Sequence, residues 1–389
     1  MRVLFWQELF WPYIGGIEVL AKNLLLELQG RGYDVTVVTS HSELDLPDEE
    51  RHEGIAIHRF PFRAALTDRN MEQLVSARRR VTRLKQAFKP DLVHLNGLGS
   101  HVLFDLQTRR AHNAPTVFTQ HNLLGRDTVG SDTLLKDMVG SVDWVTGVSN
   151  AVLDELRQLL PEITPRSSVI YNGVDVPPQV PEPLPVDAPR LLCLGRLVPQ
   201  KGFDLALTAF ASIVHRFPGA RMVIAGDGPE RPALERQCTQ LGLDDVVEFA
   251  GWVAPDRTPE LMNRATVVVM PSGWEGLPLV ALEAALMGRP VVATRVGGTP
   301  EVVVDRETGL LVEPGDSPAL AGAMALLLGD PGLAARLGLA ARERVRVAFS
   351  WEGCVNAYDD LYQRLHHAAI AGGARVARSG ETTKQAVTI

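Results

Sequence analysis

The chain has 389 residues, a formal net charge of −7 and a hydrophobic share of 46%, which is the composition of a globular protein. That length exceeds what one hydrophobic core normally serves, so we expect two domains of similar size. The acidic balance argues against a general nucleic-acid binder, because such proteins depend on massed Lys and Arg.

Cysteine usage and the N-terminal segment bear on localisation. Cys193, Cys238 and Cys354 lie far apart without metal-ligand spacing, as expected in a reducing compartment. The apolar run in MRVLFWQELF is too short for a signal peptide, and Gln7 and Glu8 interrupt it. No stretch approaches the roughly 20 apolar residues that a membrane span needs. We therefore expect a cytoplasmic protein that contacts a membrane, if at all, at its inner face.

Short apolar runs alternate with helical patterns along the first half of the chain. Strands separated by helices predict βαβ units and a mostly parallel sheet. The predicted elements are strands at Arg2–Trp6, Asp34–Thr39, Leu92–Leu95, Thr116–Thr119 and Trp144–Val148, with a helix at Ile17–Gln29.

A proline-rich stretch divides the chain. Val176–Pro189 contains six prolines in fourteen residues, which predicts a semi-rigid linker without regular structure. The strand and helix alternation then restarts, so we expect two doubly wound domains with the ligand in the cleft between them. The predicted strands are Leu191–Leu194, Arg221–Ala225, Val246–Phe249, Val267–Met270 and Val291–Thr294.

The segment MPSGWEGLPLVALEAALMGRP, from Met270 to Pro290, is the most informative. It places Glu275 in a Gly-rich loop after a buried strand and Glu283 eight residues later on a helix, whose first turn tolerates Pro278. A helix N-terminus there can bind an anion. Glu275 could accept hydrogen bonds from sugar hydroxyls, and Glu283 could hold a ribose diol. The alternative is a solvated loop glutamate at position 275 and a helix glutamate in a surface ion pair at position 283, because glutamate is most often found at the surface.

The spacing of Glu275 and Glu283 within PSGWEGLPLVALEA resembles the E-x7-E signature of the retaining glycosyltransferases of family 4. That family has the GT-B fold, in which two Rossmann-like α/β domains face a central cleft. The resemblance extends from about Met1 to Leu365. It implies a first, acceptor-side domain over residues 1–175, a linker over 176–189, and a nucleotide-sugar-binding domain over 190–349.

The end of the chain also follows the family pattern. Phe349-Ser350-Trp351 resembles an FSW-like element, after which a terminal helix over residues 350–368 crosses back to the first domain. Residues 371–389 are small, polar and unpatterned, so we expect a disordered tail.

Two cations follow the first strand of the second domain. In GRLVPQKGFD, Gly195 lets the backbone turn, and Arg196 and Lys201 follow it. An Arg fork and a Lys point charge suit a diphosphate, although an isolated pair of this kind is usually two solvated loop cations. The surrounding residues resemble the motif with which the family neutralises the departing nucleoside diphosphate. The resemblance therefore assigns Arg196 and Lys201 to catalysis.

Three further segments resemble donor-binding turns of the family. Gly226 in AGDGP is expected to allow close approach of the nucleotide. In FAGWV, the backbone of Val253 is expected to read the base, while Trp252 packs in the core or at its edge. Glu301 in RVGGTPE is expected to be structural.

One departure affects the expected phosphate contacts. Many family members have EGFG where this chain has Glu275-Gly276-Leu277-Pro278. Because Pro278 has no N–H group, the phosphate contacts are expected from Leu277 and Leu279, and Gly276 completes the donor-binding set.

Candidate residues in the first domain come from two loops. The Gly pair in WPYIGGIE lacks the G-x-G-x-x-G spacing of dinucleotide folds, and the P-x-x-G-G-x-E pattern resembles a family loop in which Gly16 would approach the donor phosphate and the acceptor. A lone His such as His121 is more often structural than catalytic. The family has a His at this position that reaches the donor sugar across the cleft. His94 and the YNGVD segment match family patterns with a structural role.

The predicted helix Met71–Phe88 is strongly basic. Its simplest interpretation is a solvated polar face. The alternative is a surface that meets anionic lipid headgroups, as in interfacial helices and in family members that act on lipid-linked acceptors. The basic residues are Arg78, Arg79, Arg80, Arg83 and Lys85.

The resemblance implies transfer of a sugar from a nucleotide-diphosphate sugar, most often a UDP-sugar, to a hydroxyl acceptor with retention of configuration. Such a reaction belongs to glycan, glycolipid or cell-envelope polysaccharide synthesis. Arg196 and Lys201 would stabilise the departing diphosphate, Glu275 would orient the sugar, and His121 would contact its outer hydroxyls. No D-x-D motif is present, so no metal or other cofactor is expected.

Two alternatives remain open at this point. A hydrolysing nucleotide-sugar 2-epimerase shares the GT-B architecture but would use paired acids and other motifs. A non-catalytic sugar-nucleotide-binding subunit would lose some of Arg196, Lys201 and Glu275, all of which are present. The acceptor and its linkage are not specified by these residues.

Overall fold

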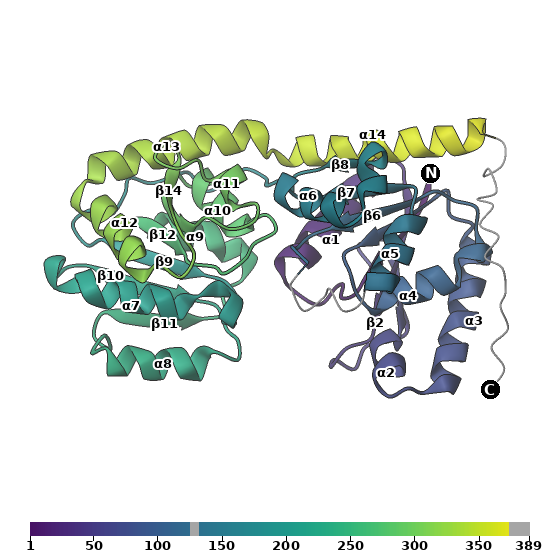
Figure 1. Cartoon of the computed structure of the whole chain (residues 1–389), viewed down its shortest axis with the longest axis horizontal. Coiled ribbons are helices and arrows are strands. Elements are labelled where there is room, and N and C mark those ends of the chain that lie inside the picture. Colours follow the sequence, from purple (N-terminus) through teal and green to yellow (C-terminus); the bar gives the residue numbers. More distant parts are fainter. Residues whose placement is uncertain (125–131, 373–389) are drawn as a thin grey trace. The chain divides into compact units, whose positions relative to one another are not determined.

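The computed structural model describes residues 1–124 and 132–372, which form two α/β units (Figure 1). The first unit contains Met1–Phe118, Ser141–Trp144 and the chain from Ala357. The second contains residues 119–124, 132–140 and Val145–Asn356. Several segments therefore group by their contacts rather than by their place in the sequence.

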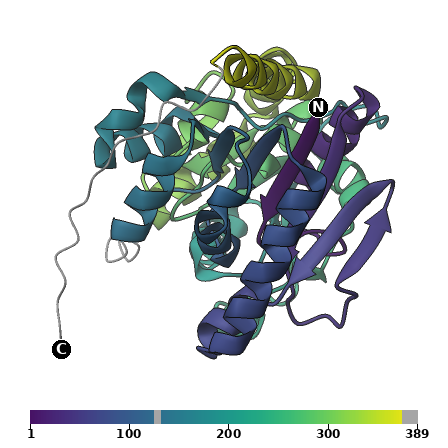
Figure 2. The ribbon, with the colours of Figure 1, turned by 90° about the vertical axis from the view of Figure 1, so that its right-hand side faces the viewer.

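The first sheet has the order β3-β4-β2-β1-β5-β6-β7-β8 in the described residues. β1 pairs in parallel with β2 and β5, whereas β3 and β4 form an antiparallel hairpin at the edge (Figure 2). The five strands predicted in this half are confirmed, and β3, β4 and β8 were not predicted. The strands are β1 (Arg2–Gln7), β2 (Asp34–Ser40), β3 (Glu49–His52), β4 (Ile55–Phe60), β5 (Leu92–Asn96), β6 (Thr116–Gln120), β7 (Trp144–Gly147) and β8 (Ser167–Val169).

Helices cover the first sheet and explain why its central strands are apolar on both faces. In β1, residues from Val3 to Gln7 are all buried. The amphipathic α1 buries Ala21, Leu24, Leu25 and Leu28 and leaves its other face exposed. The longer helices of this half are α1 (Gly16–Gly30), α2 (Phe62–Thr67), α3 (Met71–Phe88), α4 (Ser100–Gln107), α5 (Asp132–Ser141) and α6 (Asn150–Leu159).

The second sheet has the order β11-β10-β9-β12-β13-β14, with parallel pairing throughout. Counted from its first strand, this is the doubly wound order 3-2-1-4-5-6, so the strand order reverses between β9 and β12. Ligands of such sheets bind beyond the carboxyl ends of the strands at that point. The strands are β9 (Arg190–Leu194), β10 (Arg221–Ala225), β11 (Val247–Gly251), β12 (Val267–Met270), β13 (Val291–Thr294) and β14 (Gly309–Val312), of which only β14 was not predicted.

Two hydrophobic cores cover the two faces of this sheet. Val267 and Val269 belong to one core and Val268 and Met270 to the other, because successive side chains of a strand point to opposite faces. Helices α7, α8 and α12 supply the first core, and α9, α10 and α11 the second (Figure 1). The helices are α7 (Phe203–Ile213), α8 (Arg231–Gln240), α9 (Thr258–Asn263), α10 (Leu279–Leu286), α11 (Thr299–Val302), α12 (Ser317–Gly329) and α13 (Pro331–Ala348).

The proline-rich segment 176–189 forms neither helix nor strand, as predicted. It is nevertheless tied to the second unit. Asn263 donates to the carbonyl of Val180 at 2.9 Å and accepts from the N–H of Glu182 at 3.1 Å, and Thr266 donates to the carbonyl of Pro185 at 3.0 Å. These bonds fix the linker along the side of the second unit.

The long helix α14 (Trp351–Ala371) confirms the predicted return to the first unit. Its first residues group with the second unit and those from Ala357 group with the first. Tyr362 is fully buried and its hydroxyl bonds to His94, whose ring packs edge-on against Phe5. His94 therefore has the structural role that was expected. The predicted disordered tail lies almost wholly outside the described residues.

Within the described residues, no single helix is long and apolar enough to cross a membrane. Only α12 and α13 together, across a 102° bend, reach the required length and hydropathy.

Candidate functional site

The loops after β9 and β12 bring Lys201 and Glu275 together. Lys201 Nζ lies 2.6 Å from Glu275 Oε1, and Ser272 Oγ donates to the same oxygen at 2.7 Å. The Glu275 residue is only 6% exposed, so the alternative of a solvated loop glutamate is wrong. Because β9 and β12 are neighbours in the sheet, this pair stands where the strand order reverses.

The two oxygens of the Glu275 carboxylate have different environments. Oε1 is held by Lys201 and Ser272, whereas Oε2 accepts no hydrogen bond from any described residue. A carboxylate that is fixed through one oxygen can accept a ligand hydroxyl through the other. The arrangement suits an oriented sugar-binding group.

Arg196 is the second predicted cation of the β9–α7 loop. The loop leaves β9 at Gly195, whose φ of +151° favours glycine, and its next turn is held by a 2.9 Å bond from the N–H of Leu197 to the carbonyl of Asp227. Arg196 is exposed and forms no ion pair with a described residue. Its charge is therefore available to an anion, whereas the charge of Lys201 is already matched by Glu275.

The start of α10 offers a group of unused backbone donors. Pro278 directly precedes the helix, whereas it was predicted within the first turn. The N–H groups of Gly276, Leu277, Leu279 and Val280 donate to no described residue. Such N–H groups at a helix N-terminus, together with the helix dipole, form an anion-binding site. The sequence prediction named three of these four residues.

Glu283 lies on α10 and is partly buried. Burial raises the pKa of its carboxyl group to about 7. It forms no ion pair or side-chain hydrogen bond within the described residues, so the alternative of a surface ion pair is wrong. A carboxyl group without a protein partner beside an anion site can bind a diol.

Two predicted glycines are required by close backbone packing. A Cβ atom at Gly276 would lie 1.7 Å from the carbonyl oxygen of His121, and one at Gly226 would lie 1.9 Å from the carbonyl oxygen of Gly195. Real Cβ atoms never approach so closely. These positions need glycine for packing within the protein, in addition to any contact with a nucleotide.

His121 lies within the second unit by its contacts, although it was predicted on the wall of the first domain. It follows β6, it is 8% exposed, and burial lowers its pKa to about 4. The imidazole is therefore neutral near pH 7. Its backbone packs against Gly276, so the structure brings His121 to the loop that carries Glu275.

Two further residues, Gly16 and Val253, were predicted to contact the donor. Gly16 is the first residue of α1 in the first unit. Val253 is partly buried, and its N–H and C=O groups pair with no described residue. Trp252 is 59% exposed, so the interpretation that it packs in the core is wrong. The contacts of Gly16 and Val253 with a donor stay predictions.

Glu301 has the structural role that was expected. One carboxylate oxygen accepts from the backbone and side chain of Asn150 and from the Tyr171 hydroxyl at 2.8–2.9 Å, and the other accepts from the N–H of Ala151 at 2.9 Å. Glu301 thus caps α6 and joins it to the segment that leads into the linker.

A polar cluster in the first unit was not predicted from the sequence. Glu8 accepts from Ser100 Oγ at 2.7 Å and from Ser40 Oγ at 3.1 Å, and its other oxygen lies 3.0 Å from His101 Nδ1. Burial alone would raise the pKa of Glu8, but the bonds from His101 and Ser100 outweigh it and lower the pKa to about 2. The available signal was positional, because Glu8, Ser40, Ser100 and His101 each lie at or shortly after the end of a strand of one sheet.

Ser272 was missed as well, although it stands three residues before Glu275 in the most informative segment. Its hydroxyl helps to fix the Glu275 carboxylate. A serine in a loop is too common for its sequence position alone to indicate such a role.

Comparison with known proteins covers both halves of the chain. The family model described as Glycosyltransferase Family 4 matches residues 14–177, and the model described as Glycosyl transferases group 1 matches residues 179–344. A D-inositol 3-phosphate glycosyltransferase of Acidothermus cellulolyticus is 30% identical over 388 residues, covering 90% of this chain and 85% of that protein. A glycogen synthase of Mycobacterium tuberculosis is 29% identical over 398 residues, covering 93% and 94%.

Solved structures show the same architecture. Sucrose-phosphate synthase from Thermosynechococcus elongatus superposes with a TM-score of 0.83 at 26% identity, covering 94% of this chain and 99% of that chain. Anabaena HepE in complex with UDP and glucose superposes with a TM-score of 0.77 at 23% identity, covering 94% and 100%.

Proposed function

Since the chain belongs to glycosyltransferase family 4, we propose that it transfers a sugar from a nucleotide-diphosphate sugar to a hydroxyl acceptor with retention of anomeric configuration. The observation that carries the proposal is the set of groups at the reversal of strand order in the second unit. A fixed carboxylate at Glu275, an unmatched cation at Arg196 and the unused N–H groups of α10 all follow the carboxyl ends of the neighbouring strands β9 and β12.

Charge on the leaving diphosphate is the main electrostatic demand of the reaction. In the proposal, Arg196 supplies a free guanidinium fork, and Lys201 moves from sharing its charge with Glu275 to sharing it with phosphate. The N–H groups of Gly276, Leu277 and Leu279 add backbone donors to the same anion. We propose that these groups make metal unnecessary for transfer.

Hydroxyl contacts would fix the rest of the donor. The free Oε2 of Glu275 accepts from the sugar, Glu283 binds the ribose diol, and the neutral imidazole of His121 contacts outer sugar hydroxyls. Gly16 and Gly226 would approach the donor by their backbones, and Val253 would read the base.

Retention is the part of the proposal that rests on family membership. We propose that the acceptor hydroxyl attacks from the face that the diphosphate leaves, with a leaving-group oxygen taking its proton. The new bond joins the acceptor oxygen to the anomeric carbon, and the old bond to the diphosphate oxygen breaks.

The choice of donor and acceptor is supported by relatives. HepE was solved with UDP and glucose, so a UDP-sugar is the first donor to test. A mannosyltransferase of Mycobacterium tuberculosis that is 40% identical over 173 residues is named for a GDP-mannose donor and a phosphatidylinositol monomannoside acceptor. A lipid-linked acceptor at the inner face of the membrane is therefore part of our proposal. The three buried free thiols support a cytoplasmic location.

The test begins with thermal unfolding in the presence of UDP-, GDP- and ADP-sugars. A bound donor at 100 times its Kd should add about 2.7 kcal/mol to the free energy of unfolding. Proton NMR of the product formed with an acceptor panel should show the anomeric configuration of the donor, and turnover should survive EDTA. Release of a free 2-epimeric sugar would instead favour the epimerase, and an inverted product would contradict retention.

A further inference from the structure

Two groups of very different mobility hold the Glu275 carboxylate. Lys201 Nζ and Ser272 Oγ both donate to its Oε1, at 2.6 and 2.7 Å. The Lys201 ammonium group stands at the end of a flexible four-carbon chain, and 21% of that side chain is exposed. Ser272 is 2% exposed, and its short side chain has no comparable reach. The bond from Lys201 can therefore be exchanged for a ligand while the bond from Ser272 stays.

The backbone that carries the Ser272–Glu275 bond is fixed at both residues. Thr294, at the end of β13, is buried, and its Oγ1 donates to the Ser272 carbonyl at 2.5 Å. The Glu275 carbonyl accepts from the N–H of Gly298 at 3.3 Å, and a Cβ atom at Gly297 would lie 1.8 Å from the same oxygen. The carboxylate therefore stays in place when the Lys201 side chain turns away.

A bound diphosphate competes with Glu275 for Lys201. Within the described residues, Glu275 is the only ion-pair partner of Lys201. A diphosphate carries more negative charge than one carboxylate and offers several oxygens, so it attracts an ammonium group more strongly. Arg196, in the same loop and exposed, adds to the attraction for that anion. Binding of the diphosphate thus takes one of its two donors from Glu275.

Loss of Lys201 makes Glu275 a stronger acceptor for a sugar hydroxyl. A carboxylate whose charge is matched by an ammonium group accepts further hydrogen bonds more weakly than an unmatched one, which forms charge-assisted bonds. Because Ser272 keeps Oε1 in place, Oε2 gains strength as an acceptor without losing its orientation. Diphosphate and sugar should therefore bind cooperatively, and each should raise the affinity for the other by the same factor.

We propose that Ser272 is a positioning residue, which holds Glu275 for the sugar once the diphosphate has drawn Lys201 away, so that sugar recognition depends on capture of the diphosphate. The inference rests on the proposed function, because it assigns an order of events to the same site. The Lys201–Glu275 pair matches both charges until the diphosphate separates them.

Calorimetric titration with UDP and UDP-glucose tests the role of Ser272. GDP and GDP-mannose replace them if that donor stabilises the wild type more. Ser272→Ala should bind the nucleoside diphosphate like the wild type, because the phosphate contacts remain. It should bind the nucleotide sugar roughly tenfold more weakly, because the carboxylate has lost its remaining donor. Ser212→Ala is the matched control, since the Ser212 hydroxyl donates only to a carbonyl within α7, and it should bind both ligands like the wild type.

Cooperativity is measured separately, with the same nucleoside diphosphate and the free sugar of its donor. Saturating nucleoside diphosphate should raise the affinity of the wild type for the sugar by roughly fivefold or more, as is usual for coupled sites. In Lys201→Gln this coupling should disappear, because no ammonium group is left to exchange.

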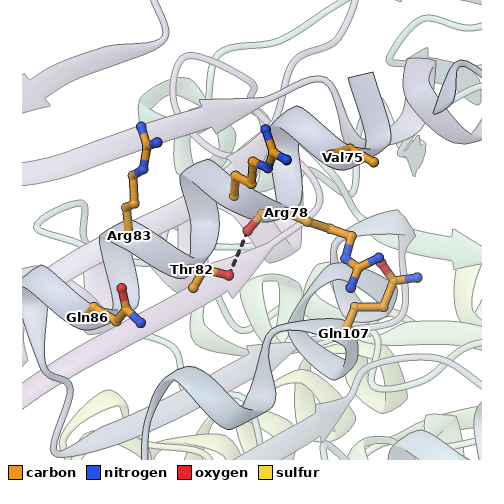
Figure 3. A pocket seen from close by; sticks show the side chains of 7 residues that line it. Val75, Arg78, Thr82, Arg83, Gln86 and Gln107 are labelled. Carbon is orange, nitrogen blue, oxygen red and sulfur yellow. Dashed lines mark hydrogen bonds between the residues drawn. The ribbon is translucent and has the colours of Figure 1, made fainter. Parts of the chain in front are cut away.

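Helix α3 of the first unit supplies the control for the loss of one positive charge. Arg78, Arg79 and Arg83 form no ion pair with a described residue and line a hollow of about 460 Å³ (Figure 3). None of them is bonded to the Glu275 loop, so Arg83→Gln should keep the full coupling.

Three results would overturn the inference while leaving the proposed transfer intact. The first two are an equal loss of affinity for nucleoside diphosphate and nucleotide sugar in Ser272→Ala, or no loss of either. The third is a wild type whose affinity for the free sugar does not change with the nucleoside diphosphate. A wild type that bound none of the nucleotide sugars would instead remove the proposed function, and the inference with it.

Discussion

Arg196 and Lys201 share one loop but differ in what their charges face. Lys201 is matched by Glu275 at 2.6 Å, whereas Arg196 has no acidic partner in the described residues. Removing Lys201 would therefore disturb Glu275 as well as any bound diphosphate. Arg196 is the cleaner probe of the leaving-group assignment.

Replacing Arg196 by Ala should lower kcat by about two to three orders of magnitude, the usual loss when one charge-stabilising group is removed. The melting temperature should stay near that of the wild type, because the side chain is exposed and unpaired. The measurement is initial rate at saturating donor. Arg257, an exposed arginine of the same unit that faces Glu260, serves as the control, since Arg257→Ala should keep full turnover. Wild-type turnover in the Arg196 variant would remove Arg196 from the mechanism.

Glu283 makes the stability of the protein depend on pH. Burial raises its pKa from 4.5 to about 7, so the folded protein holds the proton more tightly than the unfolded chain does. The contribution of this carboxyl group to the free energy of unfolding is fully present below its pKa in the unfolded chain. That contribution is lost as pH rises through its pKa in the folded protein. The affected window therefore runs from 4.5 to about 7.

The variant Glu283→Gln removes this titration. We expect the melting temperature of the variant minus that of the wild type to be larger at about pH 8 than at about pH 5. Only the wild type must ionise a buried carboxyl group at the higher pH. Thermal unfolding of both proteins across this range measures the difference. A constant difference between the two proteins at all pH values would contradict the assigned burial effect.

At the scale of elements, the candidate site is built from loops that touch through their backbones. Gly276 lies against the carbonyl of His121, and Gly297 and Gly298 lie against the carbonyls of Glu275 and Gly276. Ser149 Oγ adds a 2.8 Å bond to the carbonyl of Gly276. The position of Glu275 therefore depends on three loops that are far apart in the sequence.

Gly276→Ala tests this packing. Its methyl group would lie 1.7 Å from the His121 carbonyl, so the loops must separate. We expect a loss of about 1–3 kcal/mol in the free energy of unfolding, typical of overpacking, together with a lower transfer rate. The contrasting variant is Gly322→Ala in α12, where a Cβ atom meets nothing within 4 Å and helix propensity should add up to about 1 kcal/mol. If both variants behaved alike, backbone contact would not explain Gly276.

Individual elements differ in how well the sequence predicts them. The runs VLFW and VVVM are buried on both faces, so an unbroken apolar stretch predicted β1 and β12 correctly. β3, with the sequence EERH, has no such pattern and forms because β4 offers it a pairing edge. β8 and β14 are only three and four residues long. Their pairing depends on the neighbouring strand more than on their own residues.

At the scale of the whole molecule, α14 returns the end of the chain to the first unit. Tyr362 is fully buried, its ring faces His94, and its hydroxyl bonds to that histidine. Asp359 adds bonds to Arg31 and Tyr33. The first unit is complete only with residues that lie after the whole second unit in the sequence.

Tyr362 variants measure this dependence. Tyr362→Ala should cost about 3–5 kcal/mol in the free energy of unfolding, the usual loss for a buried aromatic ring. Tyr362→Phe keeps the ring and removes one hydrogen bond, so it should cost about 1 kcal/mol. Denaturant titration followed by tryptophan fluorescence compares the two. A Phe variant as unstable as the Ala variant would show that the hydroxyl bond, and not ring packing, anchors α14.

The sequence by itself determined the doubly wound architecture, the lack of regular structure in the proline-rich segment and most of the residues assigned to the candidate site. These features are local, because they depend on apolar periodicity, on proline and glycine, and on short motifs such as GRLVPQK and the E-x7-E pair. Each can be recognised within about thirty residues of chain.

Only the tertiary structure decided which of these residues meet. It paired Lys201 with Glu275, set His121 against Gly276, gathered Glu8 with Ser100 and left three arginines of α3 unmatched. Each contact joins segments that are distant in the chain or depends on what packs against a helix. Such contacts follow from the burial of whole sheets and helices, which no local pattern encodes.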